Sequence, residues 1–184
     1  LSYVEVLYRF VVPASRKSVA GRTVLITGAG HGLGRCMALG FARENAVLVL
    51  WDINQANNEK TARDVRDLGA QAFSYTVDCS SSSSVAETAE QVLEEVGTVY
   101  MLINNAGVLV GEDILTLTER NITQTMNINI MAHFWVRSAG KFSRAIICLV
   151  VLMDLWLFVS KPRPLDNLVH VQHVRMRCDT QLYS

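Results

Sequence analysis

The sequence has no excess of charge of either sign, because 17 Lys and Arg residues balance 17 Asp and Glu residues. A nucleic-acid-binding domain usually shows a basic excess, so this balance gives no support for a nucleic-acid partner. Cysteine is also scarce, and none of the four cysteines forms a CxxC pair: Cys36, Cys79, Cys148 and Cys178. This spacing excludes a disulfide-dense framework and favours a reducing compartment.

Long hydrophobic runs are missing as well. No run reaches the ~20 apolar residues that a membrane-spanning helix needs. The apolar stretch 145–159 contains Asp154, so we expect a buried strand or a core helix there. The shorter stretch 3–12 is either the end of a membrane anchor or a short element packed on the domain. No secretory signal peptide is recognisable.

What the chain does contain is a regular alternation of short apolar runs and helical patterns. We expect four strands, at 23–27, 46–51, 72–77 and 99–103. Helices are expected at 32–44, 55–68, from the serine run 80–84 to about residue 96, and at 118–138. Continuous apolar strands between amphipathic helices predict a Rossmann-type, doubly wound parallel α/β sheet with helices on both faces.

The 184 residues fit one domain. We expect three parts: an N-terminal segment 1–20, which is a candidate remnant of a membrane anchor, a dinucleotide-binding domain 21–140, and a divergent tail 141–184. The tail is apolar at first, and residues 165–184 are expected to be loop or disordered. If the sheet ends with the fourth strand, 99–103, that strand is left as an unpaired edge unless the tail covers it.

A glycine loop follows the first predicted strand and opens the first helix, with the sequence TGAGHGLG at 27–34. Glycine lets the backbone approach a pyrophosphate closely, and a helix N-terminus offers N–H groups to the phosphates. The alternative is a tight strand–helix turn without a ligand. The predicted coenzyme-binding residues of this loop are Gly28, His31, Gly32, Leu33 and Gly34.

Asp52 ends the second predicted strand, 18 residues after Gly34. A carboxylate at this place accepts both ribose hydroxyls of an adenosine and repels the 2′-phosphate of NADP. The loop has no Arg or Lys before Gly32, where His31 stands, and both observations favour NAD. The alternative is a solvated acid that caps the next helix through Asn54.

Two further strand ends carry polar or small residues. Asp78, with the Cys79 backbone beside it, is placed to accept from an adenine amino group, or to cap the serine-rich helix. After the fourth strand, Asn105, Ala106 and Gly107 let a coenzyme ribose lie against the chain. An Asn side chain can also tie neighbouring strands together, and Asn104 is a candidate for that structural role.

Together, these motifs resemble the short-chain dehydrogenase/reductase superfamily: TGAGHGLG (27–34), VLWDIN (49–54), VDCS (77–80), INNAG (103–107) and NINIMAHFW (127–135). They are most similar to the retinol dehydrogenases and 17-beta-hydroxysteroid dehydrogenases of the endoplasmic reticulum and lipid droplets. The resemblance implies an NAD(P)-dependent oxidoreductase acting on the CH–OH group of a lipophilic alcohol, or on the ketone. It also implies a membrane or lipid-droplet surface facing the cytosol, and is compatible with a homodimer.

The family's chemistry uses a Tyr as general acid/base, a Lys four residues later, a Ser and an Asn. A nearby Lys cation lowers the Tyr pKa toward the working pH. Asn129 matches the family's Asn and supports a water-linked proton route; its alternative role is a polar residue that kinks a helix. No Tyr in the chain has a Lys four residues on.

The family pattern fails after about Gly140, and we expect a truncated product or an altered translation of a longer dehydrogenase. The alternative function is therefore a non-catalytic dinucleotide-binding fragment. A metal site is not expected, because His170, His173 and Cys178 lie in a tail without a partner motif.

Overall fold

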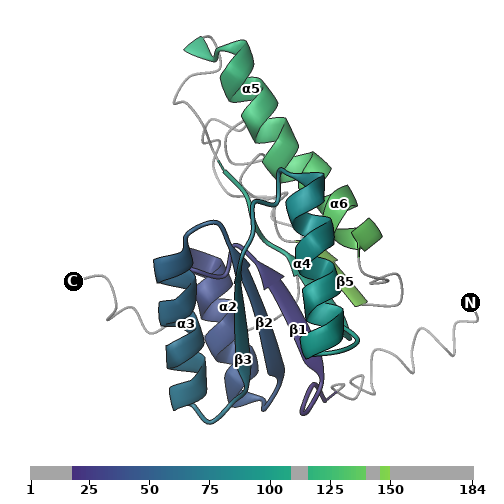
Figure 1. The fold of residues 1–184 in the computed structure, drawn as a ribbon. Helices are drawn as coiled ribbons and strands as arrows, with labels where there is room; N and C mark the ends of the chain where they lie inside the picture. The colour runs from purple at the N-terminus through teal and green to yellow at the C-terminus, as the bar shows by residue number, and fades with distance from the viewer. Residues whose placement is uncertain (1–17, 109–115, 140–145, 150–184) are drawn as a thin grey trace, which may run out of the picture.

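The computed structural model describes residues 18–108, 116–139 and 146–149 (Figure 1). Within them, five parallel strands form one sheet in the order β3-β2-β1-β4-β5. The strands are β1 (Thr23–Thr27), β2 (Val47–Asp52), β3 (Ala72–Thr76), β4 (Met101–Asn104) and β5 (Ile146–Leu149).

Helices connect the strands in the alternating pattern that the sequence predicts. They are α2 (Gly32–Arg43), α3 (Gln55–Asp67), α4 (Ser82–Glu95), α5 (Glu119–Met126) and α6 (Ala132–Ser138). The α/β doubly wound fold and its parallel sheet are confirmed, and each of the four predicted strands lies within two residues of its expected bounds at both ends.

Two apolar layers hold the helices to the sheet, because alternate residues of each strand point to opposite faces. Val24 and Ile26 of β1 belong to the cluster that packs under α2 and α3. Leu25 between them joins the cluster under α4 and α6. Figure 1 shows α2 and α3 side by side on one face of the sheet, and α4 with α6 on the other. Central strands buried on both faces explain why their sequences read as continuous apolar runs.

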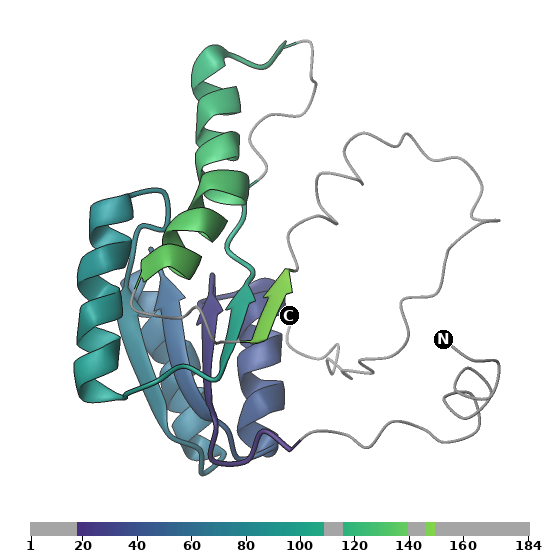
Figure 2. The same ribbon diagram turned by 90° about the vertical axis from the view of Figure 1, so that its right-hand side faces the viewer.

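Of the two possibilities for the fourth strand, an unpaired edge or an edge covered by the tail, the structure shows the second. β5 pairs with β4 in parallel register, from Met101 opposite Ile146 to Asn104 opposite Leu149. In Figure 2, β5 lies beside β4 at the end of the sheet. The apolar run that begins near residue 145 therefore supplies a strand at residues 146–149, and the expected domain boundary at 140 separates two strands that pair. The tail from 150 onward lies outside the described residues.

The expected helix 118–138 is interrupted. A π-helical turn, η2 (Asn127–Met131), separates α5 from α6. Figure 2 shows α5 rising away from the sheet, while α6 lies beside the sheet. Among the described residues, no helix has the length and apolar character needed to cross a membrane. The N-terminal segment that the sequence suggests as an anchor lies mostly outside this part of the chain.

Candidate functional site

The glycine loop leaves no room for side chains at two positions. A Cβ on Gly34 would stand 2.0 Å from the Gly28 carbonyl oxygen, and one on Gly28 would stand 2.9 Å from the Ala106 Cα. Gly28 also has a φ of 66° and Gly32 a φ of 52°, in the left-handed region that favours glycine. The loop between β1 and α2 is thus packed directly against the segment that follows β4.

The N-terminus of α2 carries no side-chain cap. Its N-cap residue, His31, makes no capping hydrogen bond, and its side chain is exposed. By contrast, Asn54, Ser81 and Thr118 each accept a backbone N–H at the start of α3, α4 and α5. The first N–H groups of a helix have no intrahelical partner, so those of α2 are available to an anion.

Asp52 is the last residue of β2 and is 6% exposed. Its Oδ2 accepts from the Gly30 N–H at 2.8 Å, and its Oδ1 accepts from the Asn54 N–H at 2.8 Å. The structure confirms its place at the strand end beside the glycine loop. It also shows that the side chain is not a solvated acid, although its neighbour Asn54 does cap α3.

Asn105 is the residue that ties the segment after β4 to the glycine loop. Its Nδ2 donates to the carbonyl oxygens of Thr27 at 2.9 Å and Gly28 at 3.1 Å. In addition, the backbone N–H groups of Asn105 and Ala106 both donate to Thr27 Oγ1 at 3.0 Å. The hydrogen bonds thus give partly buried Asn105 the strand-tying role for which Asn104, which is buried, was the candidate. Ala106, which is partly buried, and Gly107, which is exposed, follow it in the chain.

Asp78 lies two residues beyond the end of β3, in the loop before α4. Its Oδ1 accepts from both the N–H and the hydroxyl of Ser80, at 2.9 and 2.6 Å. Ser81, not Asp78, caps α4, so the capping alternative for Asp78 was wrong. The neighbouring Cys79 is buried, and burial, together with the Asp78 and Asp52 charges, raises its pKa to about 12. Its thiol is therefore neutral at physiological pH.

Asn129 lies in the π-helical turn between α5 and α6. Its Oδ1 accepts from the Val108 N–H at 2.8 Å, and its Nδ2 donates to the Val108 carbonyl at 2.9 Å. This pair of bonds fixes the chain after β4 to the helix, and it uses one of the two Nδ2 donors and one lone pair of Oδ1. The position also agrees with the expected distortion of the helix by a polar residue.

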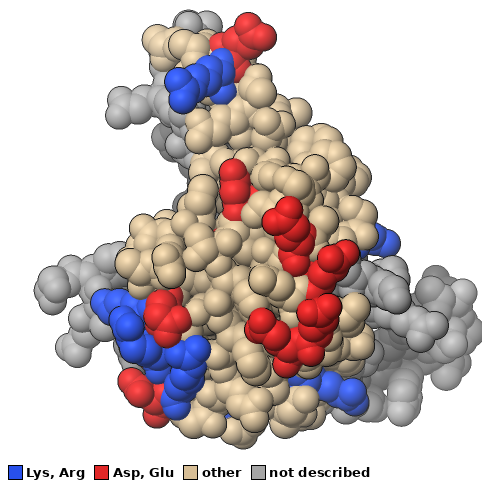
Figure 3. All heavy atoms as spheres, in the orientation of Figure 1, with Lys and Arg blue, Asp and Glu red and all other residues tan. Residues whose placement is uncertain are grey.

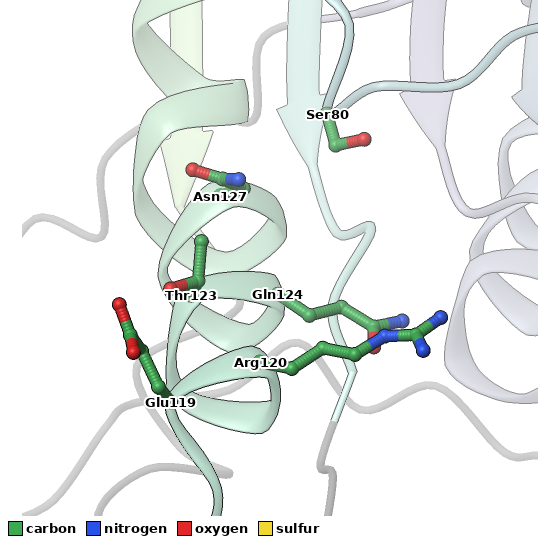
Figure 4. Close-up of a pocket in the computed structure, with 6 residues that line it drawn as sticks. All are labelled: Ser80, Glu119, Arg120, Thr123, Gln124 and Asn127. Carbon is green, nitrogen blue, oxygen red and sulfur yellow. The ribbon is translucent and has the colours of Figure 1, made fainter.

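A polar pocket of about 540 Å³ opens between α5 and the loop after β3. Figure 4 shows the side chains of Arg120 and Gln124 running in the same direction, with Glu119 pointing away from them. None of the predicted coenzyme-binding residues lines this pocket, although Ser80, which holds Asp78, does. The lining residues are Ser80, Glu119, Arg120, Thr123, Gln124 and Asn127.

The surface charge of the described residues is uneven. Helix α4 carries exposed Glu87, Glu90, Glu94 and Glu95 and no Lys or Arg. Figure 3 shows acidic side chains gathered over this helix, while basic side chains gather over α3. Because a dinucleotide is an anion, the α4 surface is electrostatically unfavourable for it, in contrast to the uncapped start of α2.

Comparison with known proteins agrees with this geometry. A family model described as short chain dehydrogenase matches residues 22–141. Human 17-beta-hydroxysteroid dehydrogenase 13 is 47% identical over 138 residues, which are 75% of this chain and 46% of that protein. Human epidermal retinol dehydrogenase 2 is 46% identical over 139 residues, covering 75% and 45%. The chain belongs to the short-chain dehydrogenase family, and it spans about half the length of the curated relatives it matches.

Solved structures support the same conclusion about the fold. An NAD⁺-bound xylitol dehydrogenase superposes with a TM-score of 0.64 at 31% identity, covering 67% of this chain and 48% of that chain. A metagenomic short-chain oxidoreductase in complex with NADP has a TM-score of 0.66 at 26% identity, covering 72% and 63%. The resemblance stated from the motifs is therefore confirmed at the level of family and fold.

Sequence reasoning missed several residues that the structure places at the site. Ile53 follows Asp52 and is 69% exposed, which is unusual for a large apolar side chain. Ser80 holds one oxygen of Asp78, and Thr61 reaches the glycine loop from α3. An apolar residue directly after a strand-ending acid is the sequence signal that would have found Ile53. The contacts of Ser80 and Thr61 leave no such trace in the sequence.

Proposed function

We propose that the described residues bind NAD through the glycine loop, as the coenzyme-holding half of a short-chain dehydrogenase. The main observation in support of this proposal is the close contact between Gly34 and the Gly28 carbonyl oxygen, which a Cβ on Gly34 would approach to 2.0 Å. This close packing holds the start of α2 against the loop. The first N–H groups of α2 have no side-chain cap. These groups would hold the pyrophosphate.

We place the adenosine half of the coenzyme beyond β2 and β3. Asp52 would accept from the ribose hydroxyls, since a carboxylate oxygen has lone pairs beyond the one that each backbone N–H occupies. Ile53 offers an exposed apolar side chain for one face of the adenine ring. Asp78 would accept from the adenine amino group through Oδ2, because Ser80 holds Oδ1.

We propose NAD as the preferred coenzyme. Asp52 is a buried carboxylate, and a 2′-phosphate beside it would lose favourable hydration and meet a like charge. The glycine loop, residues 27–34, holds no Arg or Lys that could pair with a 2′-phosphate. The solved neighbours include an NAD⁺ complex and an NADP complex, so the preference is inferred from Asp52 and not from them.

For the complete oxidoreductase we propose oxidation of the CH–OH group of a lipophilic alcohol, or reduction of the ketone. The names of the relatives, a 17-beta-hydroxysteroid dehydrogenase and an epidermal retinol dehydrogenase, support a steroid or a retinol as the substrate. The coenzyme would supply hydride transfer. In this chain Asn129 would contribute by holding the Val108 segment beside the coenzyme site.

The second candidate function is coenzyme binding without turnover. It is favoured by one observation, the absence from the 184 residues of any Tyr followed four residues later by Lys. Without that pair, the chain lacks the Tyr and Lys that the family uses to move the alcohol proton. An endoplasmic-reticulum or lipid-droplet surface and a homodimer remain proposals; exposed Ile122, Met126 and Phe134 on the α5 and α6 helices are compatible with such a contact.

Calorimetric titration of the 184-residue chain with NAD and with NADP tests the binding proposal. Saturable binding with NAD the tighter ligand is expected, and equal or tighter NADP binding contradicts the preference. Turnover is tested separately by following NADH formation with all-trans-retinol or with estradiol. Turnover by this chain would rule out the non-catalytic alternative, and its absence beside NAD binding supports that alternative.

A further inference from the structure

One face of α3 packs against the glycine loop and has no part in the binding roles given above. Asn57, Thr61 and Asp64 form it, because residues four and seven positions apart lie on one side of a helix. Thr61 is fully buried, with an exposed fraction of 0%. A buried residue on a supporting helix does not contact a ligand, so any effect on binding must pass through the loop.

The contacts of this face concentrate on the loop and on the first turn of α2. A Cβ on Gly30 would stand 3.1 Å from the Asn57 Cβ. The Asp64 carboxylate pairs with the Arg35 guanidinium at 2.7 Å, which joins α3 to the start of α2. Figure 1 shows these two helices next to each other on the same face of the sheet. Helix α3 therefore packs directly against the glycine loop and the start of α2.

Gly30 is hydrogen-bonded through both of its backbone groups. Its N–H donates to Asp52 Oδ2 at 2.8 Å. Its carbonyl lies 3.4 Å from Thr61 Oγ1, whose single hydroxyl proton is shared between this carbonyl and the nearer carbonyl of Asn57 at 3.2 Å. Together, the strand-ending acid and the buried threonine set the orientation of the peptide groups on either side of Gly30.

The orientation of the second peptide has a consequence for anion binding. In a planar trans peptide, the carbonyl and the following N–H point in opposite directions. Because the Gly30 carbonyl points toward Thr61, the His31 N–H points away from α3. Among the described residues, this N–H makes no hydrogen bond of normal geometry, although the turn at residues 29–30 brings it near the Gly28 carbonyl. It stands next in sequence to the uncapped amides of Gly32 and Leu33.

We propose that Thr61 is a positioning residue for pyrophosphate binding, whose hydroxyl holds the Gly30 carbonyl and thereby turns the His31 N–H toward the phosphates. The inference rests on the proposed function, that the glycine loop binds a dinucleotide. It adds Thr61 as a residue that affects the affinity for the phosphates without contacting them. Replacing Thr61 by Val removes the hydroxyl at similar side-chain volume and leaves the Gly30–His31 peptide free to reorient.

The test compares two probes, ADP and adenosine, by calorimetry on the full 184-residue chain. T61V is expected to weaken ADP binding by about 3-fold, the factor expected for a weak neutral hydrogen bond. Adenosine, which has no phosphate, is expected to bind T61V and the parent chain equally. Thr61→Ser restores the hydroxyl and is expected to restore ADP affinity.

Thr88 provides a matched control. It is another buried helical threonine, and its hydroxyl donates to the carbonyl four residues earlier, that of Ser84, at 2.9 Å. T88V therefore removes the same kind of bond away from the loop, and ADP affinity is expected to stay unchanged. Unchanged ADP binding in T61V overturns the inference, as does an equal loss of ADP and adenosine affinity.

A measurement on the parent chain keeps the inference testable if T61V does not fold. The His31 backbone amide is expected to show one of the largest NMR shift changes when ADP is added, and an unmoved His31 signal overturns the inference. Failure of the proposed function can also be distinguished from failure of the inference about Thr61. If the parent chain binds neither ADP nor NAD, the proposed function is wrong and the inference falls with it. If the parent binds both, the variants test Thr61 alone.

Discussion

Gly30 and Asp52 are 22 residues apart, yet the Gly30 N–H donates to the Asp52 Oδ2 at 2.8 Å in a buried hydrogen bond. A Cβ on Gly30 would stand 3.0 Å from the Asp52 Cγ, so the two residues are also in steric contact. The acid that ends β2 is thereby fixed against the loop that begins α2. This couples the proposed ribose acceptor to the proposed phosphate cradle.

Replacing Asp52 by Ser is expected to change coenzyme preference. The substitution removes the negative charge that disfavours a 2′-phosphate, so the NADP-to-NAD affinity ratio should rise by about 10-fold, or ~1.4 kcal/mol. Affinity for NAD itself should fall, because the Gly30 N–H loses its acceptor. Calorimetric titration with both coenzymes measures the ratio. Asp67→Ser, at the exposed end of α3, is the control, and an equal shift in that variant would contradict the role of Asp52.

Gly34→Ala is expected to destabilise the fold and abolish NAD binding. The new methyl group would meet the Gly28 carbonyl at 2.0 Å, and relieving that overlap requires the loop to move. The free energy of unfolding in urea should drop by about 3 kcal/mol. Gly69→Asn is the comparison, since nothing lies within 4 Å of a Cβ there and Asn tolerates the left-handed φ of 86° better than most other residues. Comparable stability of the two variants would show that the loop is not packed as described.

Asn129→Ala is expected to cost about 2 kcal/mol of unfolding free energy. It removes both hydrogen bonds to Val108 and leaves that backbone N–H and carbonyl without their partner. Asn127→Ala, two residues earlier and exposed, should have little effect. Urea denaturation measures both variants. A loss below about 0.5 kcal/mol for Asn129→Ala would mean that the amide does not hold this segment.

Much of the fold could be predicted, because each strand is a local apolar run and each helix a local periodic pattern. The pairing of β5 with β4 could not, since register between strands depends on contacts far apart in the sequence. The π-helical turn could not be predicted either. Asn129 reaches Val108 across 21 positions, and only the folded chain reveals that this bond is made.

The candidate site likewise has a part that could be predicted from the sequence and a part that could not. The glycine loop and Asp52 were predictable because close backbone approach and a strand-ending acid each leave a residue type at a fixed place. The choice between Asn104 and Asn105 was not, because it depends on which of two adjacent side chains faces β1. Thr61 gives no local signal at all, since its partner Gly30 lies 31 residues earlier.

Raising the pH above about 9 is expected to destabilise the protein through Cys79. The folded thiol has its pKa raised to about 12 by burial, whereas the unfolded thiol ionises near its ordinary value of 9.0. The unfolded chain therefore releases a proton that the folded chain keeps, and stability falls as the pH rises through this window. Between pH 8 and 10 the parent chain should lose about 1 kcal/mol more than Cys79→Ala. Equal pH dependence of the two would contradict a buried, neutral thiol.

The central claim is that NAD binds at the glycine loop and the segment after β4, and hydrogen–deuterium exchange with and without saturating NAD tests it most directly. Exchange should slow in residues 28–34 and 104–107, whereas the amides in the middle of α4 should be unaffected. Slower exchange confined to the pocket around Arg120, or no change in residues 28–34, would contradict the claim.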